Sequence, residues 1–473
     1  MACLRRPGTG LVIATLVAAG SLLAACSTVP TVDLADGHAK AADTKPLLVG
    51  AHGPLTEAQS KAILARLKRQ GQDTDVLGRH LAFEEAITDT PLTIGNKVTL
   101  LTDGASTFAA MAKAIDGAKD NINLEYFTFE DVELDGQSIV DRLLAKQASG
   151  VQVNLIYDSI GSSGTPAPVF DRLRKAGIAI LEFNPVNPLK AKGGYSLNDR
   201  DHRKILVADG KTAIIGGVNI SKVYGSPLPG MKSDEKHAGQ KPGGVYWRDT
   251  DIRIQGPAVA DLQRLFFRHW QEQGGPALAP REYDPKPVAA DHQVVRVIGS
   301  TPDQQPPYYY VTLLSAIRTA ESRIWLTEAY FVPTHQELED LVHAAKRGVD
   351  VQILLPSRSD SDAALNVGRS HYDDLLEAGV KIYEYQRGNL HCKTAVIDGV
   401  WSAIGSSNFD PRSVIYNDEV DAVILGRETG AQMEAMFKAD LMRAKEITLA
   451  AWRDRPFDEK VREMLSRTWS NLL

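Results

Sequence analysis

The chain has 473 residues and carries 53 Lys and Arg against 59 Asp and Glu, which gives a net charge of −6. Hydrophobic residues make up 43%, so wholesale disorder is excluded, and the length suits two or three domains or one large duplicated domain. The acidic total disfavours sequence-independent nucleic-acid binding, which needs a basic surface, and three cysteines are too few for a disulfide framework.

The N-terminus has the pattern of a secretory signal. Two arginines precede an apolar run over 11–25, which is short for a membrane span and typical of a signal peptide. The run ends in Leu23-Ala24-Ala25-Cys26, which resembles a bacterial lipoprotein processing site, so we expect Cys26 to be lipidated. Because Ser27 follows, we expect a lipid-anchored envelope protein on the periplasmic face of the outer membrane. An ordinary secretory signal with a chance cysteine is the alternative.

Strand-like and helix-like segments then alternate along the chain. A short helix is expected over 55–70. From residue 94 onward, apolar residues at helical spacing over 108–118 are followed by strand-like alternation over 122–126. A β-branched strand entered through a glycine follows at 150–156. This alternation predicts an α/β sandwich.

The chain also repeats itself. Four segments recur in the same order, namely Tyr126-Phe127 as Tyr330-Phe331, 150–153 as 348–351, 170–177 as 372–379, and 202–210 as 391–399. Any one match has little weight, whereas four in the same order indicate a duplication.

The duplication sets the expected domain organisation. We expect a signal peptide over 1–26, a flexible tether over 27–50, a first half over 51–275, a Pro- and Gly-rich connector over 276–294 and a second half over 295–473. The first half alone carries a long insertion at 221–247. A segment of this length is typical of a rim or lid, with disorder as the alternative.

Each half carries a His, a Lys two residues later and an Asp five residues after that. The two sets are His202, Lys204 and Asp209, and His391, Lys393 and Asp398. Because side chains alternate along a strand, the His and Lys of each set share one face. Each set is followed at the same distance by a turn of small residues and an asparagine, Asn219 or Asn408. Two copies inside a duplication make this pattern specific.

These residue types suit phosphodiester transfer, which needs a nucleophile, an acid for the leaving alkoxide and positive charge on the phosphoryl oxygens. Two facing histidines can supply the first two, Lys204 and Lys393 the charge, and Asn219 and Asn408 neutral donors. No ligand pattern suggests a metal, so neither a metal nor another cofactor is expected. The motif aspartates precede glycines and either fix the turn or touch the substrate.

With both HxKxxxxD motifs intact, the chain from about residue 94 to its end resembles the phospholipase D superfamily. The segments 181–185 and 247–251 and the Gly-Gly-x-Asn turn are similar to its bacterial cardiolipin synthase branch. The resemblance implies a duplicated phospholipase D-type α/β sandwich, in which two pseudo-twofold-related halves share one active site. It also implies a phosphohistidine intermediate, with His202 as nucleophile and His391 as acid.

A nucleophilic imidazole must be held in one tautomer by an acceptor on its other nitrogen. Aligning 246–249 with 416–419 makes Asp249 and Glu419 equivalent. Since the family has an acidic residue here that bonds a catalytic histidine, we expect Asp249 to hold His202 and Glu419 to hold His391. The apolar stripe within 262–270 predicts a core helix, and Cys392, on the opposite strand face, a buried hydrophobe.

The resemblance implies a phosphatidyltransferase of the cardiolipin synthase type, which transfers a phosphatidyl group to phosphatidylglycerol. A phospholipase D that hydrolyses phospholipids to phosphatidic acid would use the same residues and is the main alternative. A nuclease of the same superfamily and a lipid-binding envelope protein without turnover are disfavoured. The expected partners are therefore phospholipids, phosphatidylglycerol among them, and a membrane reached through the lipid anchor, with no nucleic acid. The sequence leaves the phosphatidyl donor, the transferase-or-hydrolase choice and the oligomeric state open.

Overall fold

The computed structural model describes residues 29, 31–32, 46–70, 76–187, 196, 198–225, 246–302 and 304–467. The predicted signal peptide, the lipidated Cys26, most of the tether and most of the 221–247 insertion lie outside the described residues. Among the residues that the structure does describe, none of the helices has the length and apolar character needed to cross a bilayer.

The first half is built on a mixed β-sheet. Its strands lie side by side in the order β8 (Ala179–Phe183), β7 (Gln152–Asp158), β4 (Asn121–Tyr126), β10 (Lys204–Ala208), β11 (Thr212–Gly216), β13 (Asp251–Gln255) and β3 (Leu92–Leu101). The β8–β7 and β7–β4 pairs are parallel, and the remaining pairs are antiparallel.

The second half repeats this order strand for strand. It runs β17 (Lys381–Tyr385), β16 (Asp350–Pro356), β15 (Arg323–Glu328), β19 (Lys393–Ile397), β20 (Trp401–Gly405), β21 (Asn417–Leu425) and β14 (Gln293–Ser300), with β22 (Ala444–Ile447) added beyond β17. The last strands of the two halves, β3 and β14, pair antiparallel and join the sheets. The predicted duplication is therefore confirmed.

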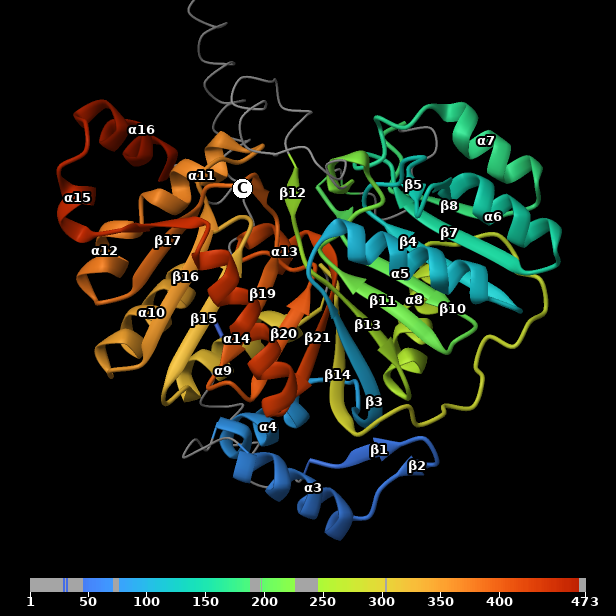
Figure 1. The fold of residues 1–473 in the computed structure, drawn as a ribbon, viewed down its shortest axis with the longest axis horizontal. Helices are drawn as coiled ribbons and strands as arrows, with labels where there is room; N and C mark the ends of the chain where they lie inside the picture. Colours follow the sequence, from blue (N-terminus) through green and yellow to red (C-terminus); the bar gives the residue numbers. More distant parts are fainter. Residues whose placement is uncertain are drawn as a thin grey trace, which may run out of the picture.

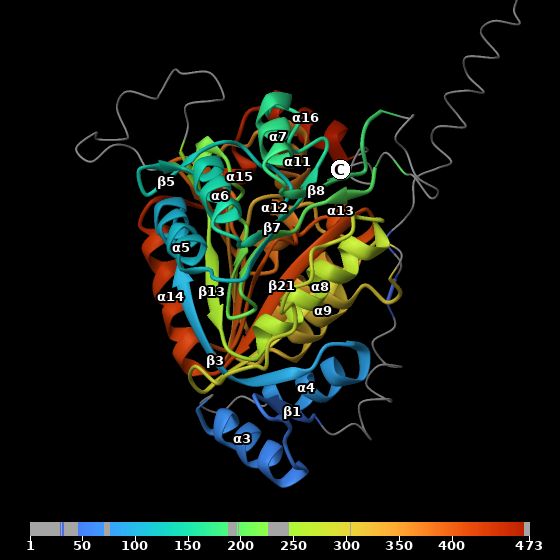
Figure 2. The ribbon, with the colours of Figure 1, turned by 90° about the vertical axis from the view of Figure 1, so that its right-hand side faces the viewer.

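Helices cover both faces of the strands (Figures 1 and 2). In the first half these are α5 (Gly104–Gly117), α6 (Ile139–Ala148), α7 (Ala167–Lys175) and α8 (Ala258–Glu272), and in the second α9 (Tyr308–Thr319), α10 (His335–Lys346), α11 (Asp362–Arg369), α12 (Tyr372–Glu377), α13 (Pro411–Ile415), α14 (Arg427–Leu441), α15 (Leu449–Arg453) and α16 (Phe457–Arg467). Figure 2 shows α5 and α14 on one side of the strands and α8 and α9 on the other. The predicted α/β sandwich is confirmed.

The segment before β3 packs against the second half. It contains β1 (Leu48–Gly50), β2 (Gly53–Pro54), α3 (Glu57–Gln70) and α4 (Val76–Ile87). Leu67 and Leu81 of these helices share one buried cluster with Leu313 and Ile317 of α9. Burial of leucines against a neighbouring helix stabilises this arrangement through the hydrophobic effect. The sequence predicts that residues 51–87 belong to the first half, but the helices of this segment thus pack in the core of the second half.

Several sequence-based expectations are confirmed. The helix expected over 55–70 is α3, the segments 108–118 and 122–126 lie in α5 and β4, and the apolar stripe lies on α8. One detail of the repeat is wrong, because Tyr126 pairs with Lys204 whereas Glu328 pairs with Lys393. Tyr126 is therefore equivalent to Glu328, and Tyr126-Phe127 does not align with Tyr330-Phe331. The sequence comparison matched Tyr126-Phe127 to an aromatic pair that lies two residues beyond its structural equivalent.

Candidate functional site

The two histidines stand where the halves meet. His202 follows the short strand β9 (Arg200–Asp201), which pairs in parallel with the start of β21 from the second half. His391 follows β18 (Asn389–Leu390), which pairs in parallel with β12 (Trp247–Arg248) from the first half. The His202 N–H donates to the carbonyl of Asp418 (2.9 Å), and the His391 N–H donates to that of Arg248 (2.8 Å). Each histidine thus lies beside an acidic segment of the other half.

Because of these strand pairs between the halves, each histidine binds the carboxylate that was expected to bind the other histidine. His202 Nδ1 lies 3.0 Å from both carboxylate oxygens of Glu419, and His391 Nδ1 lies 2.7 Å from Asp249 Oδ2. The predicted equivalence of Asp249 and Glu419 is confirmed. Each lies two residues before an aspartate, Asp251 or Asp421, and these two aspartates pair with equivalent residues of β11 and β20. The predicted pairing within each half is wrong. The parallel pairs β9–β21 and β18–β12 bring each carboxylate to the partner half instead.

The carboxylates fix the tautomers of both imidazoles. An ionised carboxylate only accepts hydrogen bonds, so Nδ1 of each ring must donate, and Nε2 keeps its lone pair. Among the described residues, no hydrogen bond involves Nε2 of His202 or His391. Each ring therefore presents Nε2 for chemistry on a phosphorus or a proton.

Glu419 is held by four donors. It accepts hydrogen bonds from Ser406 Oγ (2.5 Å), Ser413 Oγ (2.9 Å) and Asn417 Nδ2 (3.1 Å) in addition to His202. Burial by itself would raise the pKa of Glu419, but His202 and Lys204 hold it below its usual value. The carboxylate therefore stays ionised, and the imidazole of His202 is held in one orientation.

Asp249 is held differently. It accepts from the Thr250 N–H (2.8 Å) and from His391, and a Cβ added to Gly217 would collide with its carboxylate. Gly217 stands where the second half has Ser406, so a side chain that donates to Glu419 in one half has no room in the other. The Tyr224 hydroxyl also lies 3.1 Å from His391 Nδ1. The two pairs are related by pseudo-symmetry but are not identical.

The lysines are buried beside the imidazoles. Lys204 Nζ donates to the His202 carbonyl (2.5 Å), and Lys393 Nζ donates to the His391 carbonyl (2.6 Å). Their ammonium groups also lie 5.5 Å from the Phe127 ring and 5.9 Å from the Tyr330 ring, within cation–π range. Burial lowers the pKa of Lys204 to about 7 and that of Lys393 below its usual value. An anionic ligand would favour the charged form of both lysines.

Both imidazoles favour the neutral form in the ligand-free protein. Burial lowers the pKa of His202 to about 4, even though Glu419 acts in the opposite direction. Burial and Lys393 likewise lower the pKa of His391. A neutral imidazole with a free Nε2 is the form that can attack an electrophile.

The asparagines lie beside the two pairs. Asn219 is buried and accepts from the Thr128 N–H through Oδ1 (3.1 Å). Asn408 donates its own N–H to Ser413 Oγ (3.0 Å), and its Oδ1 is buried without a hydrogen-bond partner among the described residues. Their role as donors to a phosphoryl group remains a prediction.

The motif aspartates lie at the far ends of their strands. Asp209 and Asp398 follow β10 and β19, whereas the histidines precede them, and five residues of strand span about 17 Å. Asp209 accepts from the N–H groups of Lys119, Asp120 and Asn121, and Asp398 from those of Glu321, Ser322 and Arg323. Both therefore fix a turn, which is the first of the two alternatives that the sequence left open for them.

Several residues around the histidines were not expected from the sequence. The Trp247 ring lies 4.9 Å from the His391 ring, and the Phe127 ring lies 5.3 Å from the His202 ring. Ser406 lies within the small-residue turn that the motif already marked, so its position was the available signal. Tyr224, at the start of the insertion, carried no such signal. Cys392 is confirmed as a buried hydrophobe, and burial raises its pKa to about 12.

Known proteins resemble this chain over most of its length. A family described as "Cardiolipin synthase, PLD-like domain" matches residues 111–224 and 313–441. A cardiolipin synthase of Geobacillus thermodenitrificans is 34% identical over 83% of this chain and 75% of its own length. Cardiolipin synthase A of Pseudomonas aeruginosa is 34% identical over 76% of this chain and 70% of its own length.

Among solved structures, the phosphatidylserine synthase of Haemophilus influenzae is similar in fold. It matches with a TM-score of 0.59 and 14% identity, over 86% of this chain and all of its own. The duplicated sheet, the two complete histidine–lysine sets and these matches agree. The chain belongs to the cardiolipin synthase family of proteins with a phospholipase D-like domain.

Proposed function

We propose that the protein is a phosphatidyltransferase that forms cardiolipin by transferring a phosphatidyl group to phosphatidylglycerol through a phosphohistidine. The observation that carries the proposal is the exchange of carboxylates between halves, His202 with Glu419 and His391 with Asp249. This exchange supports a single site in which two imidazoles and two lysines act on one phosphodiester. Family membership supports phospholipids as its substrates.

In the first step, Nε2 of His202 attacks the phosphorus of the donor phospholipid. The P–O bond to the headgroup breaks, and protonated His391 gives its Nε2 proton to the leaving alkoxide. The negative charge of the bound phosphodiester favours the protonated form of His391 at this stage. In the second step, neutral His391 takes the proton of a phosphatidylglycerol hydroxyl. The resulting alkoxide attacks the phosphorus, and the P–N bond breaks to restore His202.

The experiment that tests the function is incubation with labelled phosphatidylglycerol, with and without a second phospholipid, followed by product analysis. Labelled cardiolipin is the expected product. Phosphatidic acid would instead show that water is the acceptor, because the hydrolase uses the same residues. A second phospholipid that raises the cardiolipin yield would identify the phosphatidyl donor. Absence of both products would contradict phosphatidyl transfer.

The pH dependence of adduct formation should reflect His202 and Lys204. With a nitrophenyl phosphodiester the leaving group needs no proton, so the protonation of His391 does not affect the first step. At substrate concentrations below KM, where the rate reflects the free enzyme, the initial release of nitrophenol should rise as the pH passes about 4, because His202 becomes neutral. It should fall above about 7, because Lys204 loses its charge. Lys204→Arg should move the falling limb to higher pH, since arginine stays charged; an unmoved limb would assign it to another group.

Catalysis should survive treatment with a chelator. The positive charge on the phosphoryl oxygens comes from Lys204 and Lys393 in the proposed mechanism, so no step requires a metal ion. We expect transfer rates with and without EDTA to agree within about twofold, well below the tenfold change that 1.4 kcal/mol produces. A loss of activity that one divalent cation restores would contradict this mechanism.

We further propose that Cys26 is lipidated and that the protein is anchored to the periplasmic face of the outer membrane, since Ser27 follows the cysteine. Cys26→Ala should leave folding and chemistry intact but release the protein from membranes, because lipoprotein processing attaches several acyl chains. Sedimentation of the variant with and without membranes measures the release. A variant that still sediments with membranes would show that the folded body binds them itself.

A further inference from the structure

Arg203 lies between His202 and Lys204 in sequence and is 1% exposed. Its Nε donates to the backbone carbonyl of Glu419 (3.0 Å), and its Nη2 donates to the Ser300 carbonyl (3.1 Å). Glu419 is the residue whose carboxylate orients His202. The guanidinium thus holds the backbone that carries this carboxylate.

The guanidinium is itself held in a ring of acidic and basic side chains. Arg203 Nη1 lies 3.2 Å from Glu125 Oε1, and Nη2 lies 3.3 Å from Asp418 Oδ1. His269 closes the ring, with Nδ1 2.8 Å from Glu125 Oε1 and Nε2 3.7 Å from Asp418 Oδ2. Glu125 and His269 come from β4 and α8 of the first half, whereas Asp418 comes from β21 of the second. The ring therefore joins the halves and contacts the backbone of Glu419, the residue that binds His202.

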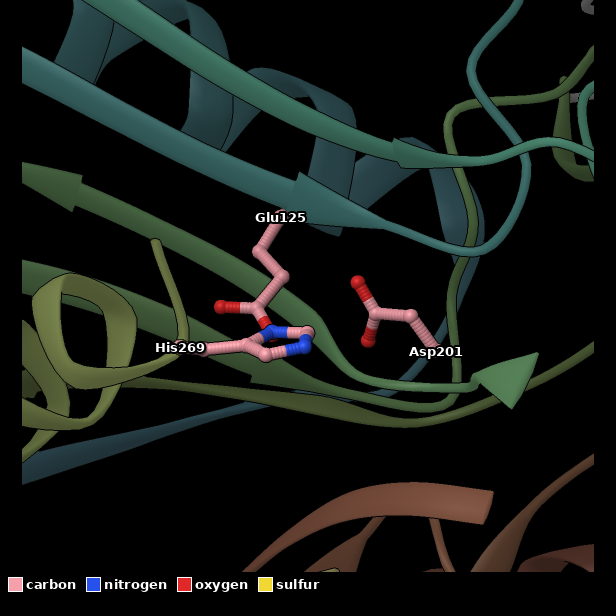
Figure 3. Close-up of side chains that lie close together, drawn as sticks. All are labelled: Glu125, Asp201 and His269. Carbon is pink, nitrogen blue, oxygen red and sulfur yellow. The ribbon is translucent and has the colours of Figure 1, made fainter. Parts of the chain in front are cut away.

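Asp201 lies against this ring. Figure 3 shows Glu125, Asp201 and His269 gathered around one point, and their ligand atoms lie within 4.8 Å of one another. Such a group could bind a cation. However, Glu125 already accepts hydrogen bonds from Arg203 and His269, and the positive guanidinium next to Glu125 would repel a metal ion bound there. Burial and the neighbouring carboxylates raise the pKa of Asp201 well above its usual value. Burial therefore favours the protonated form of Asp201, in which its carboxyl group adds no charge to the cluster.

A second guanidinium lies beneath the other pair. Arg248 is 4% exposed, and its Nη1 donates to the backbone carbonyl of Asp249 (2.5 Å), the residue whose carboxylate orients His391. Its Nε donates to Asp440 Oδ1 (3.1 Å), and its Nη2 donates to Asp440 Oδ2 (2.7 Å). A fork bound in this way has a fixed orientation.

The two arginines are not copies of one ancestral residue. The position equivalent to Arg203 in the second half is Cys392, and the position equivalent to Arg248 is Asp418. Arg203 therefore lies in a segment that carries a catalytic histidine, whereas Arg248 lies in a segment that carries an orienting carboxylate. The same contact, a guanidinium on the carbonyl of the orienting carboxylate residue, has been built twice from different positions. Duplication alone does not explain this recurrence.

We propose that Arg203 and Arg248 are positioning residues, which fix the His202–Glu419 and His391–Asp249 pairs respectively by holding the backbone of Glu419 and Asp249. The inference rests on the proposed function for its kinetic readout. Neither arginine touches the substrate in the proposed mechanism. A misplacement of about 1 Å in a reacting group can cost about a hundredfold in rate.

The test compares Arg203→Lys, Arg248→Lys and Arg296→Lys, each of which keeps the charge but removes the fork. Arg296 is the matched control, because it is also 1% exposed and binds Glu85 (2.5 Å) and the Thr90 carbonyl (2.7 Å) without contacting either histidine pair. Nitrophenyl phosphodiester turnover separates adduct formation from adduct breakdown. Calorimetry gives the stability and folded fraction of each variant, and an NMR titration gives the pKa of each imidazole.

Arg203→Lys should slow adduct formation, as a milder form of His202→Ala. Arg248→Lys should slow adduct breakdown, as a milder form of His391→Ala. Each loss should be about tenfold to a hundredfold per folded molecule. The titration of His202 should shift in Arg203→Lys, and that of His391 in Arg248→Lys. Arg296→Lys should lose stability but keep both steps within twofold. If Arg203→Lys does not fold, Asp418→Asn, which weakens the same ring, should slow the same step.

Rates and titrations unchanged from the parent, or equal losses in all three variants, would overturn the inference. A stoichiometric metal in the purified protein that Asp201→Asn removes would also overturn it, since the cluster would then be a cation site. Failure of the proposed function is distinguishable, because the parent itself would form no adduct. The NMR titrations would still test the positioning in that case.

Discussion

His202→Ala is expected to form no covalent adduct with a phosphodiester that carries a nitrophenol leaving group, whereas His391→Ala is expected to form one. An acid is dispensable when the leaving group needs no proton, but a nucleophile is never dispensable. The structure leaves Nε2 of both rings available, so geometry alone permits either assignment. Family resemblance favours His202 as the nucleophile, and this experiment separates the two roles.

The adduct should also persist longer in His391→Ala than in the parent. His391 is the residue that deprotonates the incoming alcohol in the second step, so its loss slows adduct breakdown. Rapid quenching followed by mass spectrometry of the labelled peptide measures both the yield and the lifetime of the adduct. The double variant should give no label at all. Label on His391 in His202→Ala would reverse the assignment but leave the mechanism intact.

Removal of either lysine should produce the next largest effect. Lys204→Ala and Lys393→Ala should each cost about 2–4 kcal/mol of transition-state stabilisation, by analogy with the loss of one oxyanion-hole donor. Both ammonium groups are buried next to a catalytic histidine, so solvent does not compensate for the lost positive charge. The measurement is kcat/KM for transfer, which should fall by about thirtyfold to a thousandfold.

Lys381→Ala provides the control for this effect. Lys381 is half exposed and binds Asp350 (2.7 Å) on β16, away from both histidines. Its removal should leave kcat/KM within about twofold, because a surface ion pair contributes about 0–1 kcal/mol. A loss of less than fivefold in both buried-lysine variants would mean that another group stabilises the transition state. Asn219 and Asn408 would then be the next residues to replace.

The duplication and the catalytic residue types were predictable because they are written as patterns in the chain. The histidine–lysine spacing places both side chains on one strand face, whatever the surroundings. The pairing of carboxylates was not predictable, because β9 and β18 pair with strands of the opposite half. Residues 217 apart in the chain, His202 and Glu419, meet through that pairing.

The sequence by itself determined that two similar α/β halves each present a histidine and a lysine for phosphoryl chemistry, since period-two alternation and internal repetition are local properties. Only the tertiary structure decided which carboxylate orients which histidine and that Asp209 and Asp398 fix turns instead of touching the site. It also placed Arg203 and Arg248 beneath the two pairs. These outcomes depend on contacts between segments far apart in the chain, and such contacts follow from how the two sheets pack and cross, which no local pattern encodes.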